Sequence, residues 1–106
     1  MASQVGSGRA VVTTAGTRVQ LGGAGTTMTP TTALSPVQRL VVRAIETNTD
    51  EVVVGGSGVV AAAATRNGVA LAPTQDALEL DVDDLGDIWV DALVSGEGVC
   101  FLYTVK

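Results

Sequence analysis

The segment LELDVDDLGDIWVDAL, residues 78–93, contains two runs in which side chains alternate. In its first part, Leu78, Leu80 and Val82 alternate with the acidic residues Glu79 and Asp81. The second part also alternates, because Ile88, Val90 and Ala92 fall on one face of a strand. Trp89, Asp91 and Leu93 fall on the other face. A period of two residues is typical of a half-buried β-strand. The stretch therefore predicts two strands joined by a turn.

The composition predicts strands along the rest of the chain as well. Apolar residues make up 46% of the 106 residues, yet only one Trp, one Tyr and one Phe are present. Val, Ala, Thr and Gly dominate, and β-branched residues favour pleated, half-buried surfaces. We expect an all-β protein, with eight strands close to residues 9–14, 17–21, 37–46, 51–56, 69–73, 77–82, 87–93 and 99–105.

The length suits one domain. Residues 1–8 are small and polar and predict a flexible N-terminal arm, which leaves residues 9–106 as the domain. Residues 22–36 show no hydrophobic period and predict a long Thr-, Gly- and Pro-rich loop. The segment 58–68 combines four alanines with turn residues and predicts an irregular connection. Short strands separated by turns favour a single small β-sandwich, jelly-roll or Ig-like.

Charge and residue types exclude several classes of protein. The net charge is −5, and Lys106 and five scattered arginines form no basic cluster, so we expect neither nucleic-acid nor membrane binding. We also expect no signal peptide and no membrane span. The chain has no histidine, which excludes Ser-His-Asp and Cys-His catalysis. Cys100 is the only cysteine, and we expect it in the core.

The acidic stretch itself does not predict chemistry. Its carboxylates do not follow the spacing of an EF-hand loop, because Leu85 stands where the third ligand would be. A sugar-cleaving pair of acids would be expected among more aromatic residues than this chain has. We interpret these acids as outward strand residues and turn residues, and a calcium loop of another kind is the alternative. The acids are Glu79, Asp81, Asp83, Asp84, Asp87 and Asp91. We expect no catalytic residue, no cofactor and no metal site, and hence no enzyme.

Three segments resemble a family of small structural proteins of tailed bacteriophages. They are VVVGGSGV (52–59), GVALAP (68–73) and LELDVDDLGDIWVDALVSGEGVCFLY (78–103), with RLVVRA (39–44) as a looser match. The resemblance implies a virion component, and some such proteins decorate or cement the capsid. It brings no catalytic residues with it. The chain departs from the family pattern at residues 22–36, which are longer than usual.

The expected function is therefore that of a capsid decoration (cement) protein on the virion surface, made in the host cytoplasm. Its partner would be the major capsid protein or another virion protein, and we expect a homo-oligomer. The candidate partner contacts are Met28, Pro30 and Leu34 in the long loop, and Trp89, which is either a surface anchor or a core residue. Two alternatives stay open: a tail or fibre adaptor that recognises the host, and a free carbohydrate- or calcium-binding β-sandwich module.

Overall fold

The computed structural model describes residues 4–29, 36–74 and 77–105. Over these residues the chain forms nine strands and two short 3₁₀ helices, arranged as two antiparallel sheets. None of the helices in these three ranges is long and apolar enough to cross a membrane. The prediction of a small all-β sandwich is confirmed.

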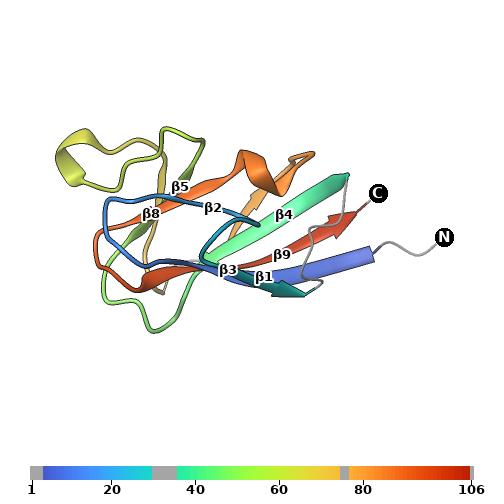
Figure 1. Ribbon diagram of the computed structural model, residues 1–106, viewed down its shortest axis with the longest axis horizontal. Coiled ribbons are helices and arrows are strands. Elements are labelled where there is room, and N and C mark those ends of the chain that lie inside the picture. The colour runs from blue at the N-terminus through green and yellow to red at the C-terminus, as the bar shows by residue number, and fades with distance from the viewer. Residues whose placement is uncertain (1–3, 30–35, 75–76, 106) are drawn as a thin grey trace.

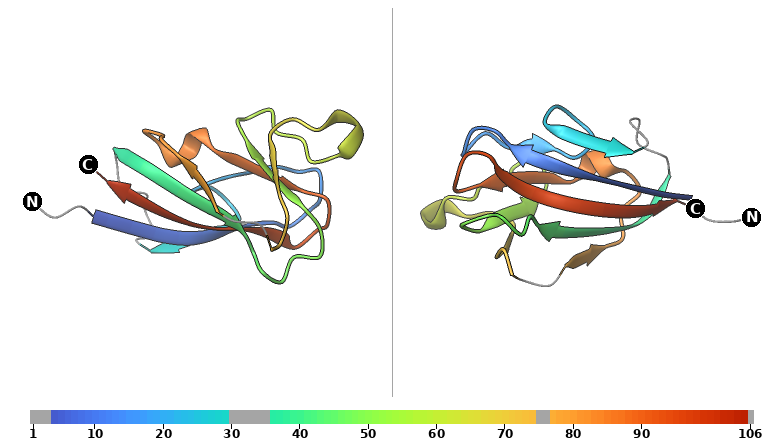
Figure 2. Two further views of the ribbon diagram at one scale, coloured as in Figure 1. Left: turned by 180° about the vertical axis from the view of Figure 1, so that it is seen from behind. Right: turned by 90° about the horizontal axis from the view of Figure 1, so that it is seen from below.

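The larger sheet has five strands and is built around the C-terminal strand. This strand, β9 (Glu97–Val105), pairs on one side with β1 (Gln4–Val12) and on the other with β4 (Val37–Ala44), so that it lies in the middle of the sheet (Figures 1 and 2). Because β1 and β9 are antiparallel, Gln4 at the start of β1 lies opposite Val105 at the end of β9. In spatial order the strands are β3 (Thr26–Thr29), β1 (Gln4–Val12), β9 (Glu97–Val105), β4 (Val37–Ala44) and β7 (Leu78–Leu80).

The smaller sheet has four strands, and the acidic stretch supplies one of its two central strands. The 3₁₀ helix η2 (Leu85–Asp87) forms the turn between β7 in the large sheet and β8 (Trp89–Ala92) in the small sheet. The second short helix, η1 (Ala63–Thr65), lies between β5 and β6. In spatial order the strands are β2 (Val19–Gln20), β8 (Trp89–Ala92), β5 (Val52–Gly55) and β6 (Val69–Leu71).

The main core lies between the two sheets. Along β9, Val99, Phe101, Tyr103 and Val105 are buried, whereas the intervening Cys100 and Leu102 are exposed. This alternation is the expected geometry of a sheet with one covered face. Aliphatic residues from both sheets complete the core, among them Leu40, Val42, Val52, Val54, Val90 and Ala92. The expectation that Cys100 is a core residue is wrong, because its place in β9 directs it to the outer face.

The N-terminal residues differ from the predicted flexible arm. Residues 4–8 belong to β1, and its inward positions are occupied by Gly6 and Gly8. A Cβ atom on Gly6 would lie 2.2 Å from Cζ of Tyr103, and one on Gly8 would lie 2.5 Å from Cβ of Met28. The glycines thus make room for large side chains that come from other strands. Residues 1–3 of the predicted arm lie outside the described residues.

The predicted long loop at 22–36 is interrupted by a strand. Residues 26–29 form β3, which pairs with β1 along the edge of the large sheet. Met28 is 8% exposed and packs in the main core, so it is not a free anchor. Threonine is β-branched and favours strands, and the Thr-rich composition of this segment is therefore compatible with pairing. Pro30 and Leu34 lie outside the described residues.

A third layer covers the outer face of the small sheet. The connection between β5 and β6, residues 56–68, folds back so that Val59 and Ala61 pack against Val53, with Trp89 and Leu93 beside them. Val60 and Asn67 form an antiparallel bridge within this connection. The predicted irregular connection is therefore confirmed, but it encloses a small second core.

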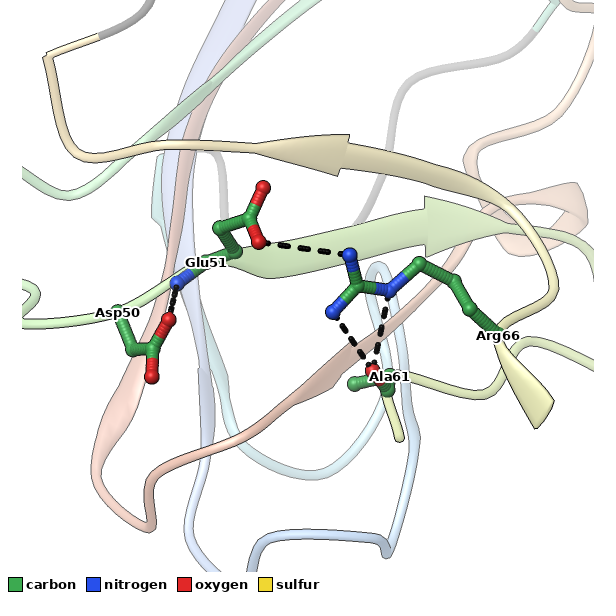
Figure 3. Close-up of polar contacts among 4 residues, drawn as sticks. All are labelled: Asp50, Glu51, Ala61 and Arg66. Carbon is green, nitrogen blue, oxygen red and sulfur yellow. Dashed lines mark hydrogen bonds and ion pairs between the residues drawn. The ribbon is translucent and has the colours of Figure 1, made fainter. Parts of the chain in front are cut away.

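Arg66 links this third layer, residues 56–68, to the start of β5. Its Nε and Nη2 donate hydrogen bonds to the carbonyl oxygen of Ala61, at 3.1 and 3.0 Å, and its Nη1 lies 3.4 Å from Oε1 of Glu51 (Figure 3). One half-buried guanidinium therefore joins the connection to the start of the strand that precedes it. This contact adds a polar link to the hydrophobic packing of Val59 and Ala61 on the outer face of the small sheet.

Candidate functional site

Asp91 is buried and serves the structure. It is 2% exposed. Its Oδ1 accepts hydrogen bonds from the backbone N–H groups of Gly16 (3.1 Å) and Ala92 (2.9 Å), and its Oδ2 accepts one from Ala61 (2.9 Å). The prediction of a solvated Asp91 is wrong because the third layer covers the outer face of β8. The carboxylate joins the turn before β2, strand β8 and the third layer.

A second buried carboxylate has a similar role. Glu97 accepts hydrogen bonds from the backbone N–H groups of Thr49 and Asp50 and from Oγ1 of Thr49. The adjacent Asn48 donates from Nδ2 to the carbonyl oxygen of Gly98, at 2.8 Å. Both side chains therefore hold the turn between β4 and β5 against the start of β9. Neither is available to act on a bound molecule.

The other acids of the opening stretch lie on the surface, as the sequence predicts. Glu79, Asp81, Asp83, Asp84 and Asp87 are all exposed. Asp84 caps η2, because its Oδ1 accepts a hydrogen bond from the N–H of Gly86 at 2.8 Å. In the three described ranges, no group of three or more His, Cys, Asp or Glu side chains is placed to hold a metal ion.

The outer face of the large sheet is the first candidate binding surface. We call it the arginine face, and it is made by the outward residues of three neighbouring strands: Val5, Ser7 and Arg9 of β1, Cys100, Leu102 and Thr104 of β9, and Arg39, Val41 and Arg43 of β4. Residues directly opposite each other in an antiparallel pair share a face. Arg9, Cys100 and Arg43 form one such row, and Ser7, Leu102 and Val41 form the next.

The arginines of this face have only exposed carboxylates near them, and the exposed Glu79 of β7 lies opposite Val41 on the same face. Arg39 lies 3.5 Å from Asp81 and Arg43 lies 3.7 Å from Glu46, but both carboxylates are about four-fifths exposed. Exposed pairs of this kind contribute about 0–1 kcal/mol. Arg9 forms no ion pair within the described part of the chain. The face therefore offers guanidinium groups beside exposed apolar residues, with Leu102 45% and Val5 55% exposed.

The second candidate is a pocket beside Trp89 on the outer face of the small sheet. Trp89 is half-buried and lies directly opposite Gln20 of β2. The pocket has a volume of about 370 Å³ and is open to solvent. Its lining comes from β2, β8 and the turns on either side of β2: Thr13, Thr17, Arg18, Val19, Gln20, Gly23, Ala24, Gly25 and Trp89.

The sequence pointed to only part of these surfaces. Of the four expected contact residues, the structure places Trp89 at a pocket and Met28 in the core, and it does not describe the other two. Arg18 and Gln20 were missed, although their alternation with Val19 in a predicted strand was a usable signal. The arginine face was also missed, because its arginines come from strands that are far apart in the sequence.

Comparison of the chain with protein-family models, with curated proteins and with solved structures finds no match. The fold and the two surfaces are therefore the observations from which a function can be argued.

Proposed function

We propose that this protein is a phage virion structural protein, and specifically a capsid decoration protein that binds the outer shell and stabilises it. The proposal starts from the sequence pattern of residues 52–59, 68–73 and 78–103, and more loosely 39–44, which resembles small structural proteins of tailed phages. The observation that carries it further is the arginine face. A protein that binds a shell needs one broad, accessible surface, and the outer face of a five-stranded sheet can provide it.

The distribution of charge supports docking through that face. The protein carries a net charge of −5, yet three of its five arginines lie on the arginine face. Arginine is enriched in protein interfaces and binds carboxylates through paired hydrogen bonds. The partner would therefore be a shell protein, in the first place the major capsid protein, with carboxylates around an apolar patch on its outer surface. Leu102 would lie near the centre of the contact, since β9 is the central strand.

The test is binding of the purified protein to capsids that lack it, measured by co-sedimentation. Leu102→Asp places a charge at the centre of the arginine face, and we expect it to reduce the affinity at least tenfold, because an uncompensated charge buried in an interface costs about 3 kcal/mol or more. Val69→Asp is a matched control, because Val69 is 49% exposed at the edge of the small sheet. Equal binding by Leu102→Asp and the unaltered protein would overturn docking through this face.

A second candidate function is a tail or fibre adaptor that recognises the host. The pocket beside Trp89 favours it, because a pocket of that size suits a small ligand better than a flat shell surface. Electron cryo-microscopy of the virion distinguishes the two functions by location and copy number. Many copies on the capsid would support decoration, whereas a few copies at the tail would support the adaptor.

A further inference from the structure

The pocket beside Trp89 brings together one aromatic side chain and two long polar side chains. Gln20 and Trp89 are directly opposed across β2 and β8 and share the outer face of the small sheet. Arg18 precedes Gln20 by two residues and also lines the pocket. An indole provides an apolar ring surface, whereas amide and guanidinium groups provide hydrogen bonds. The pocket therefore fits a ligand with one apolar face and several polar groups.

Both polar side chains keep hydrogen-bonding capacity after their contacts within the protein. Nε2 of Gln20 donates to the carbonyl oxygen of Gly86 at 2.8 Å, which fixes the amide and leaves Oε1 as an acceptor. Nη1 of Arg18 donates to the carbonyl oxygen of Val59 at 3.3 Å. Since a guanidinium has five N–H donors, four remain. The internal contacts thus position the amide and the guanidinium and leave hydrogen-bonding groups of both free for a ligand.

The charge of the pocket selects among such ligands. Arg18 is the only ionised side chain among the residues that line it. Asp91 lines the adjacent depression of about 260 Å³, to which Arg18 also contributes. However, Asp91 is already bonded to three backbone N–H groups, and it forms no ion pair with Arg18 in the described part of the chain. The one formal charge in the lining of the pocket is therefore positive, and a positive charge attracts an anion.

From these contacts we propose that the pocket binds an acidic saccharide, with a uronic acid residue as the recognised unit. The sugar carboxylate pairs with the guanidinium of Arg18, a hydroxyl donates to Oε1 of Gln20, and the C–H face of the ring packs on Trp89. Thr13 and Thr17 place further hydroxyl groups at the rim. This site is separate from the arginine face, and it does not depend on whether the protein binds a capsid.

Trp89 makes the proposal directly measurable, because it is the only tryptophan in the chain. Titration of the isolated protein with sodium glucuronate should shift the tryptophan emission to shorter wavelength, since the ligand shields the indole from water. For a ligand of this size the expected half-saturation is about 1 mM. Glucose, which lacks the carboxylate, should need at least ten times that concentration, and sodium acetate should cause no shift.

Three variants make the test specific. Arg18→Gln should weaken glucuronate binding at least tenfold, whereas Arg43→Gln, on the arginine face, should not change it. Ala24→Leu fills the pocket from its rim and should also remove binding. Thermal melting of each variant, together with proton–nitrogen NMR spectra, establishes that it is folded, and NMR shifts of residues 17–25 provide a readout independent of Trp89.

Three results would overturn the proposal. One is the absence of any change in emission or NMR shifts at glucuronate concentrations tens of times higher than the expected half-saturation concentration. Another is an equal response to acetate, which would indicate a simple anion site. The third is an unchanged affinity in the folded Arg18→Gln variant, which would remove the carboxylate contact.

Discussion

Asp91 and Asp81 are the same amino acid in one short stretch of the chain, yet they have opposite environments. Asp81 is exposed and lies beside Arg39, whereas Asp91 is buried and accepts three backbone hydrogen bonds. A buried N–H group that loses its acceptor costs about 1–3 kcal/mol, while an exposed ion pair contributes little. The stability of the protein should therefore depend on one of these carboxylates and hardly on the other.

We predict that Asp91→Ala lowers the free energy of unfolding by about 3 kcal/mol, because it leaves the N–H groups of Gly16, Ala61 and Ala92 without their acceptor. Asp81→Ala is the matched control and should change it by less than about 0.5 kcal/mol. Urea denaturation measures both values. Similar losses for the two variants would contradict the role assigned to Asp91.

Among the elements, strand β1 shows how a glycine leaves space for a large side chain of the neighbouring strand. Gly6 lies opposite Tyr103, and the phenol ring of Tyr103 occupies the space where a side chain of residue 6 would stand. Glycine normally weakens a strand. Here the cost is offset by complete burial of the tyrosine, which is 0% exposed. The strand therefore depends on its partner more than on its own propensity.

We predict that Gly6→Val destabilises the protein by about 1–3 kcal/mol, although valine is the better strand former, because Tyr103 has to move. Ser7→Val changes the adjacent outward position and should be neutral or slightly stabilising. The melting temperatures of the two variants test this. If Gly6→Val melted as high as Ser7→Val, the packing of Tyr103 over β1 would not be the reason for the glycine.

At the scale of the whole molecule, stability is expected to come from the two cores and from buried polar contacts of the Asp91 and Glu97 kind. Among the described residues, every buried side-chain nitrogen or oxygen atom has a hydrogen-bond partner. We therefore expect the protein to fold without a metal ion.

We predict that an excess of EDTA leaves the melting temperature unchanged, with the untreated protein as control. The reason is that no cluster of metal-ligating side chains exists within the described ranges. A fall of more than about 10 °C, which corresponds to ~1–2 kcal/mol for a domain of this size, would contradict this. It would also make Asp81, Asp83, Asp84 and Asp87 candidate calcium ligands.

The proposed cement function leads to a prediction for the particle. A protein that binds only the assembled shell stabilises it by linkage, with about 2.7 kcal/mol per site at a hundredfold excess over Kd. Capsids without the protein should therefore lose their DNA at a lower temperature than complete capsids, as measured by dye release on heating. Adding back Val69→Asp should restore stability, whereas Leu102→Asp should not. Equal heat stability with and without the protein would rule out cementing and favour the host-facing role.

The local alternation of side chains identified several elements of the fold. The strands near residues 37–46, 77–82, 87–93 and 99–105 could be predicted, because the period of two is a local property of the chain. The class of fold followed from the same pattern, and so did the shared face of Val90 and Ala92 in the strand near 87–93. The exposed acids at 79–87 also followed, since short carboxylates are common at outward positions and turns.

Which outward faces are covered depends on tertiary packing. Asp91 and Trp89 lie on an outward face that residues 56–68 cover or border, and β1 is ordered by Tyr103 and Met28, which come from other strands. The candidate pocket likewise needs the pairing of β2 with β8, which sets Gln20 opposite Trp89. Burial and register depend on segments that are distant in the sequence, and the local pattern of a strand holds no information about which segment will pack against it.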